Sequence, residues 1–221
     1  MSTPTDKYHN TLLFTTMKIG IYSGSFNPIH KGHTRLAEYI VKQGLVDEVW
    51  LVVSPNNPLK QRSELADEQL RYEMACLATK HIKNIRVSDI EFDMPKPNYT
   101  VNTLRKLNEK YPEHDFSLII GSDNMSLFHR WRDYETILRD YPVLVYPRKG
   151  DDITALEKLY PQMKVISGAP MLPISATEIR AALQQGSHQY DDWLEEEVRK
   201  FFLRFCLHIS DKNSTFANET K

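Results

Sequence analysis

Short runs of consecutive apolar residues alternate along this chain with longer stretches in which apolar residues recur at helical spacing. The run Val49–Val53 is apolar at every position, which is typical of a strand in a parallel sheet covered by helices on both faces. The pattern predicts strands at Lys18–Ser23, Glu48–Val53, Ile85–Ile90, Phe116–Gly121, Val143–Tyr146 and Lys164–Ser167. It predicts helices at Gly32–Gln43, Asp67–His81, Val101–Tyr111, Tyr134–Arg139, Thr177–Gln185 and Asp191–Leu207. This alternation favours an α/β fold with one doubly wound parallel sheet.

The length and charge of the chain limit what it can be. With 221 residues and no linker, we expect a single domain over residues 17–207, a disordered leader over 1–16 and a polar tail over 208–221. The net charge of -1 gives no argument for a nucleic acid or a membrane as a partner, so a phosphate site would use a few placed cations.

Cys76 and Cys206 lie far apart, which favours a reducing, cytoplasmic setting without a disulfide. No apolar run reaches the roughly 18 residues of a membrane span, and homo-oligomerisation stays open.

The segment from Gly24 to His33 carries the strongest functional signal. It links a buried strand to a helix, so backbone N–H groups and the positive end of a helix dipole would form a phosphate cradle. His30 and His33 lie on one side of the first helical turn, where both can donate to phosphoryl oxygens. Two other interpretations are a plain strand–helix turn with surface histidines and a His-x-x-His metal site, which lacks a third ligand nearby.

A second segment suited to phosphate binding begins at Ile174. Ser175 and Glu178 have the S-x-x-E spacing of a helix capping box. Thr177 and Arg180 lie on one face near the same helix start. Two helix N-termini that face one site would hold a triphosphate between them, whereas the plainer interpretation is a helix cap alone.

Ligands in a doubly wound sheet bind beyond the carboxyl ends of the strands, so we inspected the loops after strands one, two, three, four and six. Lys60, after the second strand, would either reach the phosphates or be a solvated lysine. Tyr99 and Thr100 open the helix after the third strand, where Thr100 or Asn98 would otherwise serve as an N-cap.

The loop after the fourth strand contains Asp123 and Asn124, with Trp131 just beyond. Asp123 could bind a ribose hydroxyl or a charge. Trp131 could stack on a flat ring or simply pack in the core. These segments, which follow different strands, would meet at one edge of the sheet.

Together these segments resemble a nucleotidyltransferase family whose signature G-x-F-x-P-x-H-x-G-H is met by Gly24, Phe26, Pro28, His30, Gly32 and His33. Residues 174–180 resemble its second signature, I-S-S-T-x-I-R, with Ala176 in place of the middle serine. Where the family often has P-P-H-K, Leu59 replaces the histidine. The blocks around Tyr99 and Trp131 are most similar to the nicotinate-nucleotide adenylyltransferase branch. The resemblance covers about residues 17–205 and implies a Rossmann-like nucleotidyltransferase fold.

The resemblance implies adenylyl transfer from ATP to nicotinate mononucleotide, which yields nicotinate adenine dinucleotide and pyrophosphate in NAD biosynthesis. The catalytic residues that it implies are His30, His33 and Arg180. The implied ATP and phosphate ligands are Gly24, Ser25, Phe26, Lys60, Ser175 and Thr177. The implied ligands of the mononucleotide are Tyr99, Thr100, Asp123, Asn124 and Trp131. Mg²⁺ would be carried by ATP and need few protein ligands, because it prefers phosphate oxygens and water.

The nucleophile in this reaction is a phosphate oxygen that is already anionic, so we expect no general base. No arginine lies in the Tyr99–Thr100 segment, so we expect backbone N–H groups to recognise the carboxylate of the ring, with Trp131 as its floor. Two alternatives stay open. One is an adenylyltransferase for phosphopantetheine or another mononucleotide, and the other is a nucleotide-binding module without catalysis.

Overall fold

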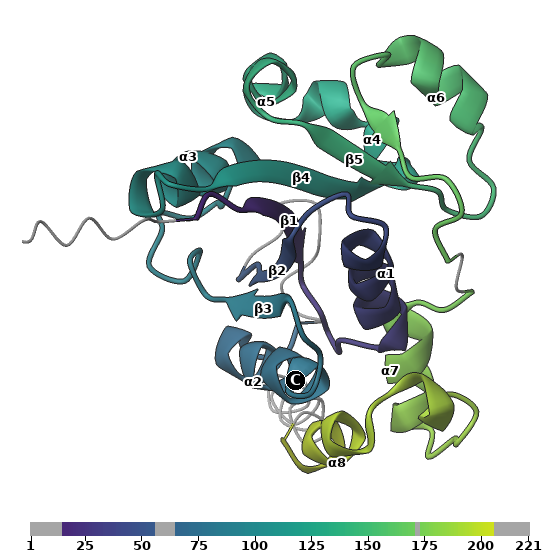
Figure 1. The fold of residues 1–221 in the computed structure, drawn as a ribbon. Helices are drawn as coiled ribbons and strands as arrows, with labels where there is room; N and C mark the ends of the chain where they lie inside the picture. Colours follow the sequence, from purple (N-terminus) through teal and green to yellow (C-terminus); the bar gives the residue numbers. More distant parts are fainter. Residues whose placement is uncertain (1–14, 56–64, 171–172, 206–221) are drawn as a thin grey trace, which may run out of the picture.

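The computed structural model describes residues 15–55, 65–170 and 173–205 (Figure 1). Most of the expected leader, the polar tail, Cys206 and Lys60 lie outside the described residues. Within the described ranges, strands and helices alternate as the hydrophobic pattern predicts, and the α/β fold is confirmed.

The strands form one parallel sheet in the order β3-β2-β1-β4-β5-β6. Their bounds are β1 (Lys18–Gly24), β2 (Glu48–Val53), β3 (Ile85–Ser88), β4 (Asp115–Gly121), β5 (Val143–Tyr146) and β6 (Lys164–Val165). All of the predicted strands are confirmed, although β3 and β6 end earlier than predicted. The strand order reverses between β1 and β4, so the loops that follow these two strands diverge and open the crevice where such sheets bind ligands.

Helices cover both faces of the sheet. Their bounds are α1 (Lys31–Lys42), α2 (Glu68–Thr79), α3 (Thr100–Lys110), α4 (Ser122–Met125), α5 (Tyr134–Asp140), α6 (Ile153–Leu159), α7 (Ala176–Gln184) and α8 (Glu196–Phe205). Short 3-10 turns lie at η2 (Phe128–Arg130) and η3 (Asp191–Trp193). One face carries α1, α2, α7 and α8, and the other carries α3, α4, α5 and α6 (Figure 1).

Two groups of elements differ from the prediction. The short elements α4, η2 and α6 were not predicted, because a segment of one or two turns contains too few residues to show a helical period, and α6 buries none of its side chains fully. The single helix predicted over Asp191–Leu207 is wrong. The chain makes a 3-10 turn, becomes extended at the buried Leu194, and only then enters α8. Leu194 and the residues of α8 share an apolar pattern that hides this break.

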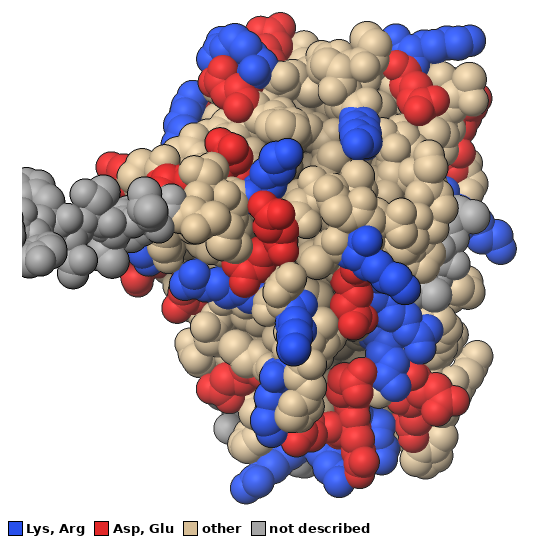
Figure 2. All heavy atoms as spheres, viewed as in Figure 1, with Lys and Arg blue, Asp and Glu red and all other residues tan. Residues whose placement is uncertain are grey.

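Acidic and basic side chains are interspersed on the face shown in Figure 2, in keeping with the net charge of -1. Basic residues do not gather there into a continuous stripe of the kind that tracks a nucleic acid backbone. None of the helices in the described part of the chain has the length and apolar character needed to cross a membrane.

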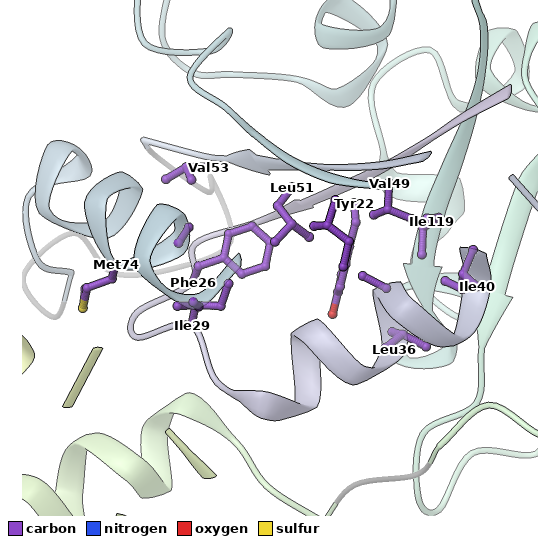
Figure 3. Packing of buried hydrophobic residues seen from close by; sticks show 14 of the residues in the cluster. Tyr22, Phe26, Ile29, Leu36, Ile40, Val49, Leu51, Val53, Met74 and Ile119 are labelled. Carbon is purple, nitrogen blue, oxygen red and sulfur yellow. The ribbon is translucent and has the colours of Figure 1, made fainter. Parts of the chain in front are cut away.

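The strands β1, β2, β4 and β5 each divide their side chains between two buried clusters. In β2, Val49 and Leu51 face the helices α1 and α2, whereas Trp50 and Val52 face α3 and α5. This division explains why the strand is apolar at every position. Figure 3 shows the first cluster, which also contains Phe26 from the loop after β1, only 3% exposed. The predicted phosphate loop is therefore anchored in the core by one of its own side chains.

Candidate functional site

A cavity of about 1180 Å³ opens at the carboxyl end of the sheet, at the crevice between β1 and β4. Every predicted site residue that the structure describes lines it: Gly24, Ser25, Phe26, His30, His33, Tyr99, Thr100, Asp123, Asn124, Trp131, Ser175, Thr177 and Arg180. Lys60 lies outside the described residues. His33 and Arg180 therefore share one cavity, although they come from distant parts of the chain.

The two histidines form a capping box at the start of α1. The Nδ1 atom of His30 accepts a hydrogen bond from the N–H of Gly32 at 3.1 Å. The Nδ1 atom of His33 accepts one from the N–H of His30 at 3.2 Å. Since each Nδ1 is an acceptor, each ring carries a proton on Nε2, and that N–H can donate to a ligand. A Cβ at Gly32 would lie 2.7 Å from the His30 ring, so this close packing requires glycine.

The capping box was not predicted, because the sequence signature for such a box has serine or threonine rather than histidine. It also argues against the metal interpretation of the pair. With both Nδ1 atoms accepting N–H groups, each Nε2 carries a proton and has no lone pair to offer a metal. Among the residues that the structure describes, no group of three or more His, Cys, Asp or Glu side chains is arranged to hold a metal ion.

His30 is a neutral donor near pH 7. Burial, helped by the Arg148 guanidinium, lowers the pKa of His30 from 6.5 to about 4. A neutral imidazole can donate one hydrogen bond to a phosphoryl oxygen but adds no positive charge. The charge that offsets the phosphates must therefore come from other groups.

This shift predicts a dependence of stability on pH. The unfolded chain takes up a proton on His30 below about pH 6.5, and the folded chain does so only near pH 4. The unfolding free energy should thus fall as the pH is lowered from 6.5 to 4, by on the order of 3 kcal/mol for this group. Urea unfolding across that range measures the slope. His30→Asn keeps a strong N-cap without a titrating ring, and it should show a shallower slope. Equal slopes in the two proteins would contradict the assignment.

Arg71 of α2 clamps the phosphate loop from inside the molecule. Its guanidinium is 1% exposed and donates to the carbonyl oxygens of Ser25 at 2.7 Å and Ser54 at 2.8 Å, while Nε donates to that of Ala66 at 2.8 Å. Phe26, the next residue in the loop, has a positive φ of 43° and so a strained backbone. Because C=O and N–H point in opposite directions across a trans peptide, the bond to Ser25 turns the Phe26 N–H away from Arg71.

Sequence reasoning missed Arg71. It lies among the apolar positions of α2, and its partners are carbonyl groups of two separate loops, which no local pattern reveals. An arginine on the apolar side of a predicted helix was the only signal in the sequence.

The start of α7 supplies the second predicted helix N-terminus. Ser175 Oγ accepts from the Glu178 N–H at 3.2 Å, and Glu178 Oε2 accepts from the Ser175 N–H at 2.9 Å, so the predicted capping box is confirmed. Arg180 Nη1 donates to the carbonyl oxygen of Asn27 at 2.7 Å, and Nη2 donates to Thr177 Oγ1 at 3.4 Å. Arg180 thus joins α7 to the phosphate loop and brings the two helix N-termini to one cavity.

The loop after β5 adds a residue that we did not inspect in the sequence. Arg148 lies 3.2 Å from Asp123 Oδ1 and donates to the Tyr146 hydroxyl at 3.0 Å. The Tyr146 hydroxyl is in turn 3.2 Å from that of Tyr22. Asp123 is therefore paired with an arginine, and Arg148 lines the same cavity as Arg180.

At the start of α3, the N-cap residue is Tyr99, and no side chain caps the helix. The predicted caps are therefore wrong. Asn98 donates to the carbonyl oxygen of Glu91 at 3.1 Å instead, and Thr100 is the first residue of the helix. Thr103 also donates to Glu91, at 2.8 Å to Oε1. The bonds to Glu91 tie this end of α3 to the preceding loop. Burial raises the pKa of the Glu91 carboxyl.

The sequence offered two interpretations of Trp131, stacking on a ligand ring and packing in the core, and its position in the structure is compatible with both. Its half-buried ring packs against Phe128, with 5.0 Å between the centroids, and it also lines the cavity. The next residue, Arg132, holds its Cζ atom 4.9 Å from the centroid of the Tyr99 ring. The Tyr99–Thr100 segment has no arginine in sequence, but the fold brings one to it.

These features define a class of α/β protein that binds nucleotide phosphates at the switch point of its sheet. The family model for cytidylyltransferase-like proteins matches residues 21–182, and the chain belongs to that family.

Similar proteins narrow the class further. The chain is 47% identical to a probable nicotinate-nucleotide adenylyltransferase of Flavobacterium johnsoniae over 173 residues, which cover 78% of this chain and 89% of that protein. It is also 47% identical to the protein of the same name from Bacteroides thetaiotaomicron over 169 residues, or 76% and 83% of the two chains. The solved Plasmodium falciparum nicotinic acid mononucleotide adenylyltransferase complexed with NaAD has a TM-score of 0.73 at 20% identity, covering 86% and 97%. The family resemblance expected from the motifs is confirmed, and this last likeness supports the fold alone.

Proposed function

We propose that this chain transfers the adenylyl group of ATP to nicotinate mononucleotide and releases pyrophosphate. The observation that carries the proposal is the shared cavity of the His30–His33 pair and Arg180, with Trp131 and Tyr99 lining the same space. The names of relatives at 47% identity support the choice of acceptor. The reaction is a step of NAD biosynthesis.

In the proposed reaction, a phosphate oxygen of the mononucleotide attacks the α-phosphorus of ATP. A P–O bond forms there while the bond to the pyrophosphate oxygen breaks. The attacking oxygen carries no proton near pH 7, so no side chain has to remove one. The enzyme aligns the two substrates and stabilises the negative charge that gathers on the phosphates.

The residues divide this work by their chemistry. His30 and His33 donate from Nε2 to the α- and β-phosphate oxygens, together with the N-termini of α1 and α7. Arg180 supplies positive charge to the triphosphate, and the guanidinium of Arg148 adds to the positive charge in the same cavity. ATP enters as its magnesium complex, in which phosphate oxygens and water hold the metal. Gly24, Ser25, Phe26, Ser175 and Thr177 contact the phosphates in this proposal.

The mononucleotide occupies the other part of the cavity. Its pyridine ring stacks on Trp131 near Tyr99 and Thr100, and Asp123 and Asn124 contact its ribose. This arrangement places its phosphate toward the histidines, where the attack takes place.

The test is to incubate the protein with Mg-ATP and one acceptor at a time, and to measure pyrophosphate. The acceptors are nicotinate mononucleotide, nicotinamide mononucleotide and phosphopantetheine, with a reaction that lacks any acceptor as the control. We expect pyrophosphate and nicotinate adenine dinucleotide chiefly with nicotinate mononucleotide. Release with phosphopantetheine alone would support the alternative transferase, and no release with any acceptor would support a non-catalytic nucleotide-binding module.

A further inference from the structure

Arg132 lies beside the part of the cavity where the ring of the mononucleotide is proposed to bind. It follows Trp131 directly, and both residues line the cavity together with Tyr99 and Thr100. Its guanidinium lies over the Tyr99 ring at 4.9 Å from the centroid. A positive charge therefore lies against Tyr99, one of the aromatic side chains that bound the ring site.

The contact with Tyr99 leaves the hydrogen-bonding groups of Arg132 unused. A guanidinium stacked on an aromatic face makes that contact through its own face, and its five N–H groups point outward in its plane. Among the residues that the structure describes, no carboxylate pairs with Arg132. The nearby acidic residues have other partners, since Asp133 lies 3.5 Å from Arg105 and Asp123 lies 3.2 Å from Arg148.

We propose that Arg132 binds the carboxylate of the nicotinate ring and makes the enzyme prefer the acid to the amide. This inference rests on the proposed function. Carboxylate and carboxamide groups have nearly the same shape, so packing against Trp131 cannot separate them. They differ by one unit of charge, and a guanidinium donates two parallel hydrogen bonds to a carboxylate. A carboxamide would turn its NH₂ donor toward another donor, which is unfavourable.

The position of Arg132 suits this role for two further reasons. Tyr99 holds the guanidinium from one face, so less side-chain freedom is lost when a ligand binds. The side chain is exposed at the mouth of the cavity, so its attraction for an anion should weaken as salt is added. The acid preference should then be sensitive to ionic strength, which a preference set by shape alone would not be.

The experiment compares kcat/KM for nicotinate mononucleotide and for nicotinamide mononucleotide in the wild type and in Arg132→Gln. We expect the acid-to-amide ratio to fall about tenfold or more, through loss of the acid substrate, with the KM for ATP unchanged. Arg132→Lys keeps the charge without the paired hydrogen bonds and should give an intermediate ratio. Added salt should lower the ratio of the wild type and leave that of Arg132→Gln nearly constant.

The matched control is Arg130→Gln, which removes the neighbouring guanidinium from the lining of the same cavity. Its ratio should stay within about twofold of the wild type, because a screened charge without a direct contact contributes little. An unchanged ratio in Arg132→Gln, or equal losses in both variants, would overturn the role of Arg132. A wild type that releases no pyrophosphate with nicotinate mononucleotide would instead overturn the proposed function, so the two failures are distinguishable.

Discussion

Replacing His33 with alanine should lower kcat by about 10²–10³-fold, the usual effect of removing one donor that acts on charge in the transition state. In the proposed mechanism His33 donates from Nε2, because its Nδ1 accepts the N–H of His30. The charge that builds up on the transferring phosphate makes this bond stronger in the transition state than in the bound substrates. Steady-state pyrophosphate release with saturating substrates measures the change.

His33 also caps α1, so alanine removes a structural hydrogen bond that is worth about 0.5–2 kcal/mol. Two further variants separate the effects. His33→Asn places an acceptor near the Nδ1 position, so it should restore stability but remain inactive. His33→Gln places an N–H donor near the Nε2 position and should recover part of kcat. A kcat close to the wild type in His33→Asn would remove the Nε2 donor from the mechanism.

Replacing Arg180 with methionine should reduce kcat/KM for ATP by about 10²-fold or more, because a charged donor to the phosphates is lost. The variant also loses the hydrogen bond to the Asn27 carbonyl, one of the bonds that hold the phosphate loop. The ring site at Trp131 is untouched, so the KM for nicotinate mononucleotide should change much less than that for ATP. Initial rates with each substrate varied in turn give both constants.

Arg180→Lys tests whether charge alone is enough. Lysine has a single nitrogen and cannot hold the Asn27 carbonyl and reach a phosphate in the fixed geometry of a guanidinium, so it should recover only a small part of the activity. Lys200→Met, on the outer face of α8, removes an exposed cation that pairs with Glu196 and should leave both constants unchanged. An Arg180→Met protein with normal kcat/KM for ATP would show that the triphosphate is held elsewhere.

Most of the fold could be predicted from the sequence because the two periods, of strands and of helices, are local properties. The bounds of β2 and β5 are those predicted, since each strand is a short apolar run with a clear boundary. β2 begins at Glu48 and ends before Ser54, and β5 is flanked by Pro142 and Pro147. The short helices α4 and α6 were not predicted, because one or two turns contain too few residues to show a helical period. The break before α8 escaped because Leu194 is buried in an extended conformation yet keeps the apolar spacing.

The site residues also fall into those that local patterns predicted and those that they did not. Residues that follow a strand and open a helix, such as His33 and Thr177, were found because strand ends in a parallel sheet meet at one edge. The arginines were harder to find. Arg71 contacts carbonyl groups of two loops. Arg148 follows the end of β5, whose loop was not among the candidate loops, and Arg132 contacts Tyr99, which is distant in sequence. The partners of each are set by tertiary contacts, which no local spacing encodes.

The bond between Arg180 and Asn27 has a consequence for how the protein is made. Synthesis proceeds from the N-terminus, so the sheet can be complete once β6 has emerged, and the turn before α1 is present well before that. The Asn27 carbonyl can accept its hydrogen bond from Arg180 only after α7 has been synthesised and has packed. A ribosome-bound intermediate therefore has the scaffold without a finished nucleotide cradle, and ATP can add its binding energy only to the nearly completed molecule.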